Sequence, residues 1–380
     1  VNVPGEVYRT DIRSAHRIVV KVGTSSLTYP TGKLNLSRLE ELVRELADIQ
    51  NQGREVILVS SGAMGAGQGK LGFDRRPRTI PEKQAAAAVG QGILMHIYEK
   101  LFSEYSQMVA QVLLTRFDLM DRLRYLNARN ALNTLLQLGV IPIVNENDTV
   151  AVEGLKFGDN DTLSALLAGL IDAELLIILS DIDGVYTADP REDPEAERLP
   201  VIEEITEEIE RLAGGVGTEM ASGGMATKIQ AARIATSSGV YVVIADSREK
   251  NIVRRILDGE PLGTLFVPRE NKLDARKRWI AFGSTVRGSV WIDDGAVEAL
   301  LQKGKSLLPS GIIRVEGIFE AGQVISVKSA MGLEIARGIV NYSSGAVERI
   351  QGHRTGEIEK VLGYKEFDEV IHRNNLIVIT

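Results

Sequence analysis

The stretch Arg17-Ile-Val-Val-Lys-Val-Gly-Thr-Ser25 begins as a β-branched apolar run and ends in a lysine, a glycine and two hydroxyl side chains. A continuous run of this kind is typical of a strand that is buried on both faces of a parallel sheet. A second run, Glu55-Val-Ile-Leu-Val59, is also followed by small polar residues, Ser60-Ser61-Gly62. Both stretches therefore predict buried strands that lead directly into a polar segment.

A helix is predicted between these two strands. Apolar side chains recur at helical spacing from Leu39 to Ile49, and Gly53 ends the pattern. Ser37, with Glu40 three residues later, is the predicted amino-terminal cap. Further apolar runs at 108–114, 140–144, 175–179 and 240–245 alternate with helical stretches around 82–104, 118–138, 161–170 and 226–237. This alternation predicts an α/β fold whose open, mostly parallel sheet is sandwiched by helices.

Polar segments follow four of the predicted strands. They are Lys21-Val-Gly-Thr-Ser25, Ser60-Ser-Gly-Ala63, Asn145-Glu-Asn-Asp148 and Ser180-Asp181. Because the carboxyl ends of parallel strands meet at one edge of a sheet, we expect these segments to lie together there and to form a ligand site. Their lysine, amides and carboxylates predict binding of a nucleoside triphosphate and a small amino acid.

The length of the chain and the pattern of its predicted strands and helices indicate two domains. The 380 residues exceed what one ordinary core holds. The alternating pattern covers residues 1–262, and residues 263–275 hold the proline, glycine and charged residues of a linker. Residues 276–380 contain short β-rich runs separated by glycines, which predict a small barrel.

Charge and composition exclude several classes of protein. The net charge is −7, divided as −9 before residue 275 and +2 after it, which permits RNA contact only in the second part. The absence of cysteine excludes disulfides, thiolate zinc sites and cysteine nucleophiles. Residues 1–10 lack the apolar core of a secretion signal, and no run of eighteen apolar residues exists. The expected location is the cytoplasm.

Two glycine motifs are incomplete. Gly67-Gln-Gly-Lys-Leu-Gly72 fits the dinucleotide pattern G-x-G-x-x-G, but it does not directly follow a strand and no helix is predicted after it. A P-loop is excluded because Met64 replaces its first glycine and Leu71 replaces its Ser or Thr.

Lys21 and Lys228 are the candidate cations for an anionic ligand. Lys21 is followed by Gly23, where the backbone can approach a phosphate closely. Lys228 lies in Gly223-Gly-Met-Ala-Thr-Lys228, where glycines open a predicted helix whose first N–H groups favour anions. The alternative for Lys21 is that it is an ordinary surface lysine, and the alternative for the glycine-rich stretch before Lys228 is that it is an ordinary flexible loop.

Carboxylates and amides crowd Asn145-Glu-Asn-Asp148 and Gly158-Asp-Asn-Asp161. Such groups can bind an ammonium group, orient a lysine or reach Mg²⁺ indirectly. The alternative is that Asp159 or Asn160 simply caps the helix that follows. The four histidines show no metal-binding spacing.

Eight segments in this order resemble the glutamate 5-kinases of the amino acid kinase family. They are Lys21-Val-Gly-Thr-Ser25, Val59-Ser-Ser-Gly-Ala63, Leu113-Leu-Thr-Arg116, Tyr125-Leu-Asn-Ala-Arg129, Asn145-Glu-Asn-Asp148, Gly158-Asp-Asn-Asp161, Tyr186-Thr-Ala-Asp-Pro190 and Gly223-Gly-Met-Ala-Thr-Lys228. Residues after the linker resemble a PUA domain in Arg276-Lys-Arg-Trp-Ile280, Asp293-Asp-Gly-Ala296 and Ser306-Leu-Leu-Pro309.

The resemblance implies that ATP phosphorylates the side-chain carboxylate of L-glutamate to L-glutamyl 5-phosphate, the first step of proline biosynthesis. It implies Lys21, Lys228 and Asp161 as catalytic residues, and Ser61, Asp148 and Asn160 as glutamate-binding residues. Its ATP-binding positions are Lys21, Gly23, Ser180, Asp181, Ser222, Gly223, Gly224, Met225, Ala226, Thr227 and Lys228. Mg²⁺ is expected through the ATP phosphates, without direct protein ligands.

Further expectations come from the same resemblance. They are feedback inhibition by proline, a homo-oligomer (dimer or tetramer), and handover of the labile product to the next enzyme. RNA binding by the PUA-like domain is compatible with its near-neutral charge but is unsupported, and no membrane partner is expected. Ala221-Ser222 departs from the Gly-Thr of many relatives and restricts the backbone of the ATP loop.

Three other functions are considered. A related kinase acting on N-acetylglutamate, aspartate or carbamate would share the fold and ATP site, because fold alone does not fix function. A PUA-based RNA-binding or regulatory protein, and a phosphate-sensing module without turnover, are the two non-enzymatic alternatives.

Overall fold

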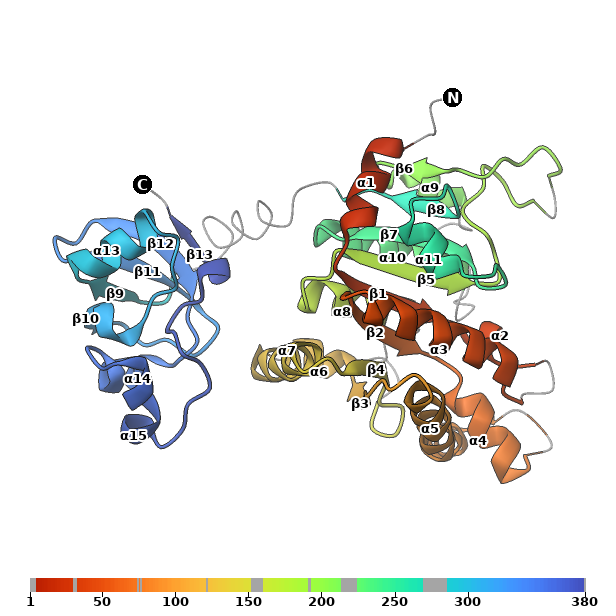
Figure 1. Cartoon of the computed structure of the whole chain (residues 1–380), viewed down its shortest axis with the longest axis horizontal. Helices are drawn as coiled ribbons and strands as arrows, with labels where there is room; N and C mark the ends of the chain where they lie inside the picture. Colours follow the sequence, from red (N-terminus) through yellow and green to blue (C-terminus); the bar gives the residue numbers. More distant parts are fainter. Residues whose placement is uncertain are drawn as a thin grey trace. The chain divides into compact units, whose positions relative to one another are not determined.

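The computed structural model describes residues 5–29, 33–73, 75, 77–120, 122–151, 160–190, 193–212, 224–268 and 286–378. The chain forms two compact units (Figure 1). The first unit extends to Glu270 and the second begins at Asn271.

A sheet of eight strands forms the centre of the first unit, in the order β3-β4-β2-β1-β5-β7-β8-β6 (Figure 1). Neighbouring strands from β3 to β7 are parallel, and β8 pairs antiparallel to β7. The strands are β1 (Arg17–Val22), β2 (Glu55–Ser60), β3 (Val109–Leu114), β4 (Ile141–Glu146), β5 (Leu175–Ser180), β6 (Val201–Ile202), β7 (Tyr241–Asp246) and β8 (Thr264–Phe266). The predicted open, mostly parallel α/β sheet is confirmed.

Helices cover both faces of this sheet. Successive residues of β1 point to opposite faces, so that Ile18 and Val20 join one apolar core while Val19 joins the other. The helices are α1 (Glu6–Ser14), α2 (Thr24–Leu27), α3 (Leu36–Asn51), α4 (Ala63–Leu71), α5 (Ile80–Ser103), α6 (Arg116–Met120), α7 (Arg122–Gln137), α8 (Asn160–Leu170), α9 (Glu207–Leu212), α10 (Met225–Ser237) and α11 (Ile252–Leu257). Helices α3 and α5 pack on the face of Ile18, and α8 and α10 pack on the face of Val19. No described helix combines the length and apolar character that a bilayer span requires.

Two local predictions are wrong. Asn35, not Ser37, caps α3, and its side chain accepts a hydrogen bond from the Arg38 backbone N–H at 3.2 Å. Thr264–Phe266, inside the predicted linker, forms strand β8, because its three buried residues pair with β7 on one side and β6 on the other.

The incomplete G-x-G-x-x-G motif lies largely within helix α4, where its first glycine permits close helix packing. A Cβ atom added at Gly67 would lie 1.8 Å from the Ala86 carbonyl oxygen of α5. The contact is reciprocal, since a Cβ at Gly90 of α5 would lie 1.6 Å from the Ala63 carbonyl oxygen. These glycines bring two helix backbones together.

The second unit contains a mixed sheet of five strands in the order β10-β9-β11-β12-β13. The strands are β9 (Ser289–Ile292), β10 (Ile312–Glu316), β11 (Val324–Ser329), β12 (Glu334–Ile339) and β13 (Leu376–Val378), with helices α13 (Asp294–Leu301), α14 (Ser344–Ile350) and α15 (Ile358–Leu362). Its apolar core is separate from the two cores of the first unit. The predicted β-rich character of this part is confirmed.

We predict that Gly67→Ala lowers the free energy of unfolding of the first unit by about 1–3 kcal/mol or more, because the new methyl group overpacks the α4–α5 contact. Gly69→Ala on the same helix is the matched control, since a Cβ there would meet no atom within 4 Å. Ala exceeds Gly in helix propensity by about 1 kcal/mol, so the control should be neutral or stabilising. Scanning calorimetry measures both, and equal unfolding temperatures would contradict the packing role.

Candidate active site

The carboxyl ends of four adjacent parallel strands bring the predicted polar segments to one edge of the sheet. The strands lie in the order β4-β2-β1-β5. Lys21 of β1 is in register with Val59 of β2 and Ile178 of β5, so these strands reach their polar ends at the same level. The prediction that the four segments share one sheet edge is confirmed.

Asp161 binds both candidate lysines at this edge. Its Oδ1 lies 2.5 Å from Lys21 Nζ, and its Oδ2 lies 3.1 Å from Lys228 Nζ. The three side chains come from β1, α8 and α10, which the sheet topology brings together although they are far apart in sequence. Asp161 is fully buried, and Lys21 and Lys228 are 5% and 3% exposed. One carboxylate therefore joins three elements of the fold.

The electrostatics of this triad favour an anion. Burial alone raises the pKa of Asp161, but the ammonium groups of Lys21 and Lys228 outweigh it, so that the pKa lies below its ordinary value. The carboxylate is therefore ionised at neutral pH. Two ammonium groups facing one carboxylate leave a net charge of about +1 in a largely desolvated site.

Glycines lie on two sides of the triad. Gly23 follows Lys21 in extended conformation, and a side chain there would begin 3.5 Å from Lys21 Nζ. Gly224 caps α10 without a side chain, and Lys228 lies in the first turn of that helix. Thr227 Oγ1 donates to the Gly224 carbonyl oxygen at 2.8 Å and also lies 3.3 Å from Asp161 Oδ2. Free N–H groups at a helix start beside a lysine suit a phosphate.

Part of the predicted ATP loop, Ala221, Ser222 and Gly223, lies outside the described residues, as does Asp159. Met225 and Ala226 open helix α10 together with Thr227 and Lys228.

Amide side chains connect the next predicted residues. Asn160 Nδ2 donates to Ser61 Oγ at 2.8 Å and to Asn145 Oδ1 at 2.9 Å. Asn160 directly precedes Asp161, so Ser61 and the triad are held by adjacent residues of α8. Asp148 lies on the wall of a cavity of about 310 Å³ that Asn147 and Gln91 also line.

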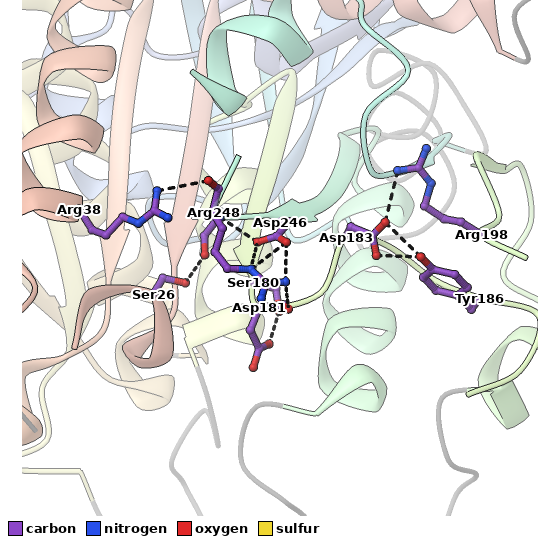
Figure 2. A network of polar contacts seen from close by, with 10 residues as sticks. Ser26, Arg38, Ser180, Asp181, Asp183, Tyr186, Arg198, Asp246 and Arg248 are labelled. Atoms are coloured by element: carbon purple, nitrogen blue, oxygen red, sulfur yellow. Dashed lines mark hydrogen bonds and ion pairs between the residues drawn. The ribbon is translucent and has the colours of Figure 1, made fainter. Parts of the chain in front are cut away.

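Ser180, the last residue of strand β5, and Asp181, which follows it, belong to a second polar network (Figure 2). Ser180 Oγ lies 3.1 Å from Asp181 Oδ1, and Arg248 donates to the Asp181 carbonyl oxygen at 3.1 Å. Arg248 also binds both carboxylate oxygens of Asp246 at the end of β7. Burial raises the pKa of Asp246, but its bonds to Arg248 outweigh this and lower the pKa. The network ties the ends of β5 and β7 together.

Asp246, Arg248 and Gln91 are site neighbours that sequence reasoning missed. Asp246 ends a strand that the sequence predicts, so the strand-end rule applied to β7 would have found it and, two residues later, Arg248. Gln91 lies within the long helix α5 and has no local sequence signal.

We predict that Asp161→Asn lowers the free energy of unfolding of the first unit by about 3–5 kcal/mol at pH 7, because two buried ammonium groups lose their counter-charge. The folded pKa of Asp161 is lowered, so its stabilisation is complete above the ordinary pKa of about 3.9 and is lost as the pH falls through the folded pKa. Calorimetry at pH 7 and below pH 4 should therefore show that the difference in unfolding free energy between the wild-type protein and Asp161→Asn shrinks in acid.

Asp258→Asn is the control, because this carboxylate is 63% exposed and lies 3.8 Å from Arg254. Its effect should stay within about 0.5 kcal/mol. An equal effect of the two variants would contradict a special role for Asp161.

Known proteins are similar in sequence to this chain over nearly its full length. The model of the amino acid kinase family matches residues 16–246, and that of the PUA domain matches residues 288–362. Glutamate 5-kinase from Moorella thermoacetica is 58% identical over 371 residues, covering 98% of this chain and 98% of the relative. Glutamate 5-kinase from Caldanaerobacter subterraneus is 55% identical over 363 residues, covering 96% and 98%. Glutamate 5-kinase from Carboxydothermus hydrogenoformans is 54% identical over 372 residues, covering 98% and 100%. The chain therefore belongs to the amino acid kinase family, within it to the glutamate 5-kinases, and carries a PUA domain in its second unit.

Proposed function

We propose that this protein transfers the γ-phosphoryl group of ATP to the side-chain carboxylate of L-glutamate, giving L-glutamyl 5-phosphate in the first step of proline biosynthesis. Relatives named glutamate 5-kinase, 54–58% identical over nearly the full length, support the substrate and the reaction. The observation in the structure that carries the proposal is the buried Lys21–Asp161–Lys228 triad at the sheet edge.

The triad suits phosphoryl transfer to a carboxylate. The acceptor is already ionised at neutral pH, so the reaction needs no general base. A carboxylate oxygen bonds to the γ-phosphorus as the bond to the leaving ADP oxygen breaks. Lys21 and Lys228 would offset the charge on the transferring group, and Asp161 would hold both ammonium groups in place. In-line positioning of the two reactants contributes about 7–11 kcal/mol to such reactions.

The substrates would occupy neighbouring parts of the edge. We assign glutamate to Ser61, Asn160 and Asp148, supported by the Ser61–Asn160 bond and the cavity beside Asp148. We assign ATP to the ends of β1 and β5 and to the start of α10, where glycines and first-turn N–H groups suit phosphates. The ATP residues are Lys21, Gly23, Ser180, Asp181, Ser222, Gly223, Gly224, Met225, Ala226, Thr227 and Lys228.

The proposed reaction also uses Mg²⁺. Among the described residues, no three acidic or histidine side chains converge as a metal-binding group. Asp161, buried at the sheet edge, is already bound by both lysines. We propose that Mg²⁺ arrives on the ATP phosphates, since Mg²⁺ keeps its waters and binds substrate phosphates readily. Bound there, it would neutralise charge on the β- and γ-phosphates.

Domain limits and regulation follow as further proposals. We place the catalytic domain in residues 1–262 with β8 added to it, and the PUA-like domain in residues 276–380. β8 supports this extension, because it completes the sheet of the first unit.

We also propose that proline competes with glutamate, since both carry an α-carboxylate and an α-amino group.

We predict that, with ATP and Mg²⁺, L-glutamate supports ADP release, whereas N-acetylglutamate and L-aspartate do not. Hydroxylamine added to the assay should trap the acyl phosphate as a hydroxamate, because the product is an activated carboxyl group. Release of ADP with another acceptor alone would assign the chain to a different substrate. Absence of turnover with all three would favour a binding or regulatory role.

We predict that Lys228→Met lowers kcat about 10²- to 10³-fold, the usual cost of removing one group that stabilises transition-state charge. Lys70→Met, at an exposed lysine of α4, is the matched control and should leave kcat unchanged. Steady-state kinetics measures both variants, and a kcat for Lys228→Met within threefold of wild type would refute the catalytic role of this lysine.

A further inference from the structure

A chain of side-chain amides runs from helix α8 through strand β4 to helix α5. Asn160 Nδ2 donates to Asn145 Oδ1 at 2.9 Å, and Asn145 Nδ2 donates to Gln91 Oε1 at 3.0 Å. Asn145 and Gln91 are buried, at 4% and 8% exposure. The last member, Gln91, lies on the wall of the 310 Å³ cavity.

A backbone group fixes the direction of this chain. The N–H of Glu146 donates to Asn145 Oδ1 at 2.9 Å, and a backbone N–H cannot accept a hydrogen bond. Asn145 must therefore turn its oxygen toward Glu146 and its NH₂ group toward Gln91. Gln91 must in turn present its oxygen to Asn145, which leaves its own NH₂ group at the end of the chain. The NH₂ group of Gln91 is therefore the donor that remains. Its position follows from the Glu146 N–H and not from an arbitrary choice of amide orientation.

Gln91 Nε2 has no hydrogen-bond partner among the described residues, although the atom is buried. Buried polar side-chain atoms are in large majority paired, so such an atom calls for an explanation. Gln91 lines a cavity with Asp148 and Asn147, and that volume suits a small ligand. A buried donor that has no partner among the described residues, on a side chain that lines a cavity, is suited to an acceptor oxygen of a ligand.

We propose that Gln91 is a further substrate-binding residue, whose Nε2 donates a hydrogen bond to the α-carboxylate of the amino acid acceptor. This inference rests on the proposed function. The reacting carboxylate must lie near Lys21 and Lys228, next to Asp161. Gln91 is separated from Asn160 by two side-chain hydrogen bonds, through Asn145. It is therefore placed to bind the carboxylate at the other end of the substrate. Asp148, in the same cavity, suits the α-ammonium group.

Gln91→Met removes the donor at nearly constant side-chain size, and Gln91→Glu keeps an oxygen for Asn145 while replacing the donor with a charged oxygen. Both should raise KM for L-glutamate about 10- to 100-fold, the effect of losing one hydrogen bond to a charged group, with kcat and KM for ATP within threefold. Gln84→Met and Gln84→Glu, on the same helix α5 but outside the lining of the cavity, are the matched controls. They should leave KM for L-glutamate unchanged.

A substrate analogue tests direct contact. L-Isoglutamine keeps the side-chain carboxylate of glutamate but carries a carboxamide in place of the α-carboxylate. Its N–H groups can donate to the carboxylate introduced by Gln91→Glu. The ratio of kcat/KM for isoglutamine to that for glutamate should therefore rise at least about tenfold in Gln91→Glu, as expected for one recovered hydrogen bond.

Each result decides the matter. An unchanged KM for glutamate in an active Gln91→Met variant would overturn the proposal. A raised KM with an unchanged isoglutamine ratio in Gln91→Glu would also overturn it, because Gln91 would then act only through Asn145. Absence of glutamate turnover by the wild-type protein would instead refute the proposed function, so the two failures are distinguishable.

Discussion

The ion pairs of Asp161 are the constraint on which the site depends. A buried carboxylate is costly unless it is paired, and here two ammonium groups from β1 and α10 pair with it. The same contacts hold the two lysines in place before any substrate binds. The positive charge that we propose for catalysis is therefore preorganised by the fold, in the way that electrostatic stabilisation of a transition state requires.

The topology of the sheet explains why residues so distant in sequence meet. Strands β4, β2, β1 and β5 are parallel neighbours, and each delivers a polar segment to the same edge. Helix α8 begins at that edge, so that Asn160 bonds toward β2 and β4 while Asp161 bonds toward β1 and α10. Asn160 and Asp161 thus link the part of the site that we assign to glutamate with the part that we assign to the ATP phosphates.

The sequence predicted the strands and their polar ends because both are local patterns, and Lys21 and Ser61 lie in such ends. The binding role expected for Asn160, at the start of a helix, came instead from the resemblance to the glutamate 5-kinases. The linker prediction failed at β8, because its pairing with β7 and β6 is a tertiary contact. The role of Gly67 in helix packing was also beyond prediction, since it depends on the approach of α5. Gln91 was missed for the same reason: its significance comes from Asn145, 54 residues away.

The NH₂ group of Gln91, which has no partner among the described residues, places stability and function in opposition. A buried donor without a partner among the described residues costs the ligand-free protein about 1–3 kcal/mol, whereas the oxygen of the same side chain is paired with Asn145. Selection for heat resistance alone would thus favour a replacement that removes this donor and still accepts the hydrogen bond of Asn145, whereas selection for use of a dilute substrate would keep the glutamine. A thermostabilised form of this protein obtained without an activity screen would be expected to lose substrate affinity at this position first.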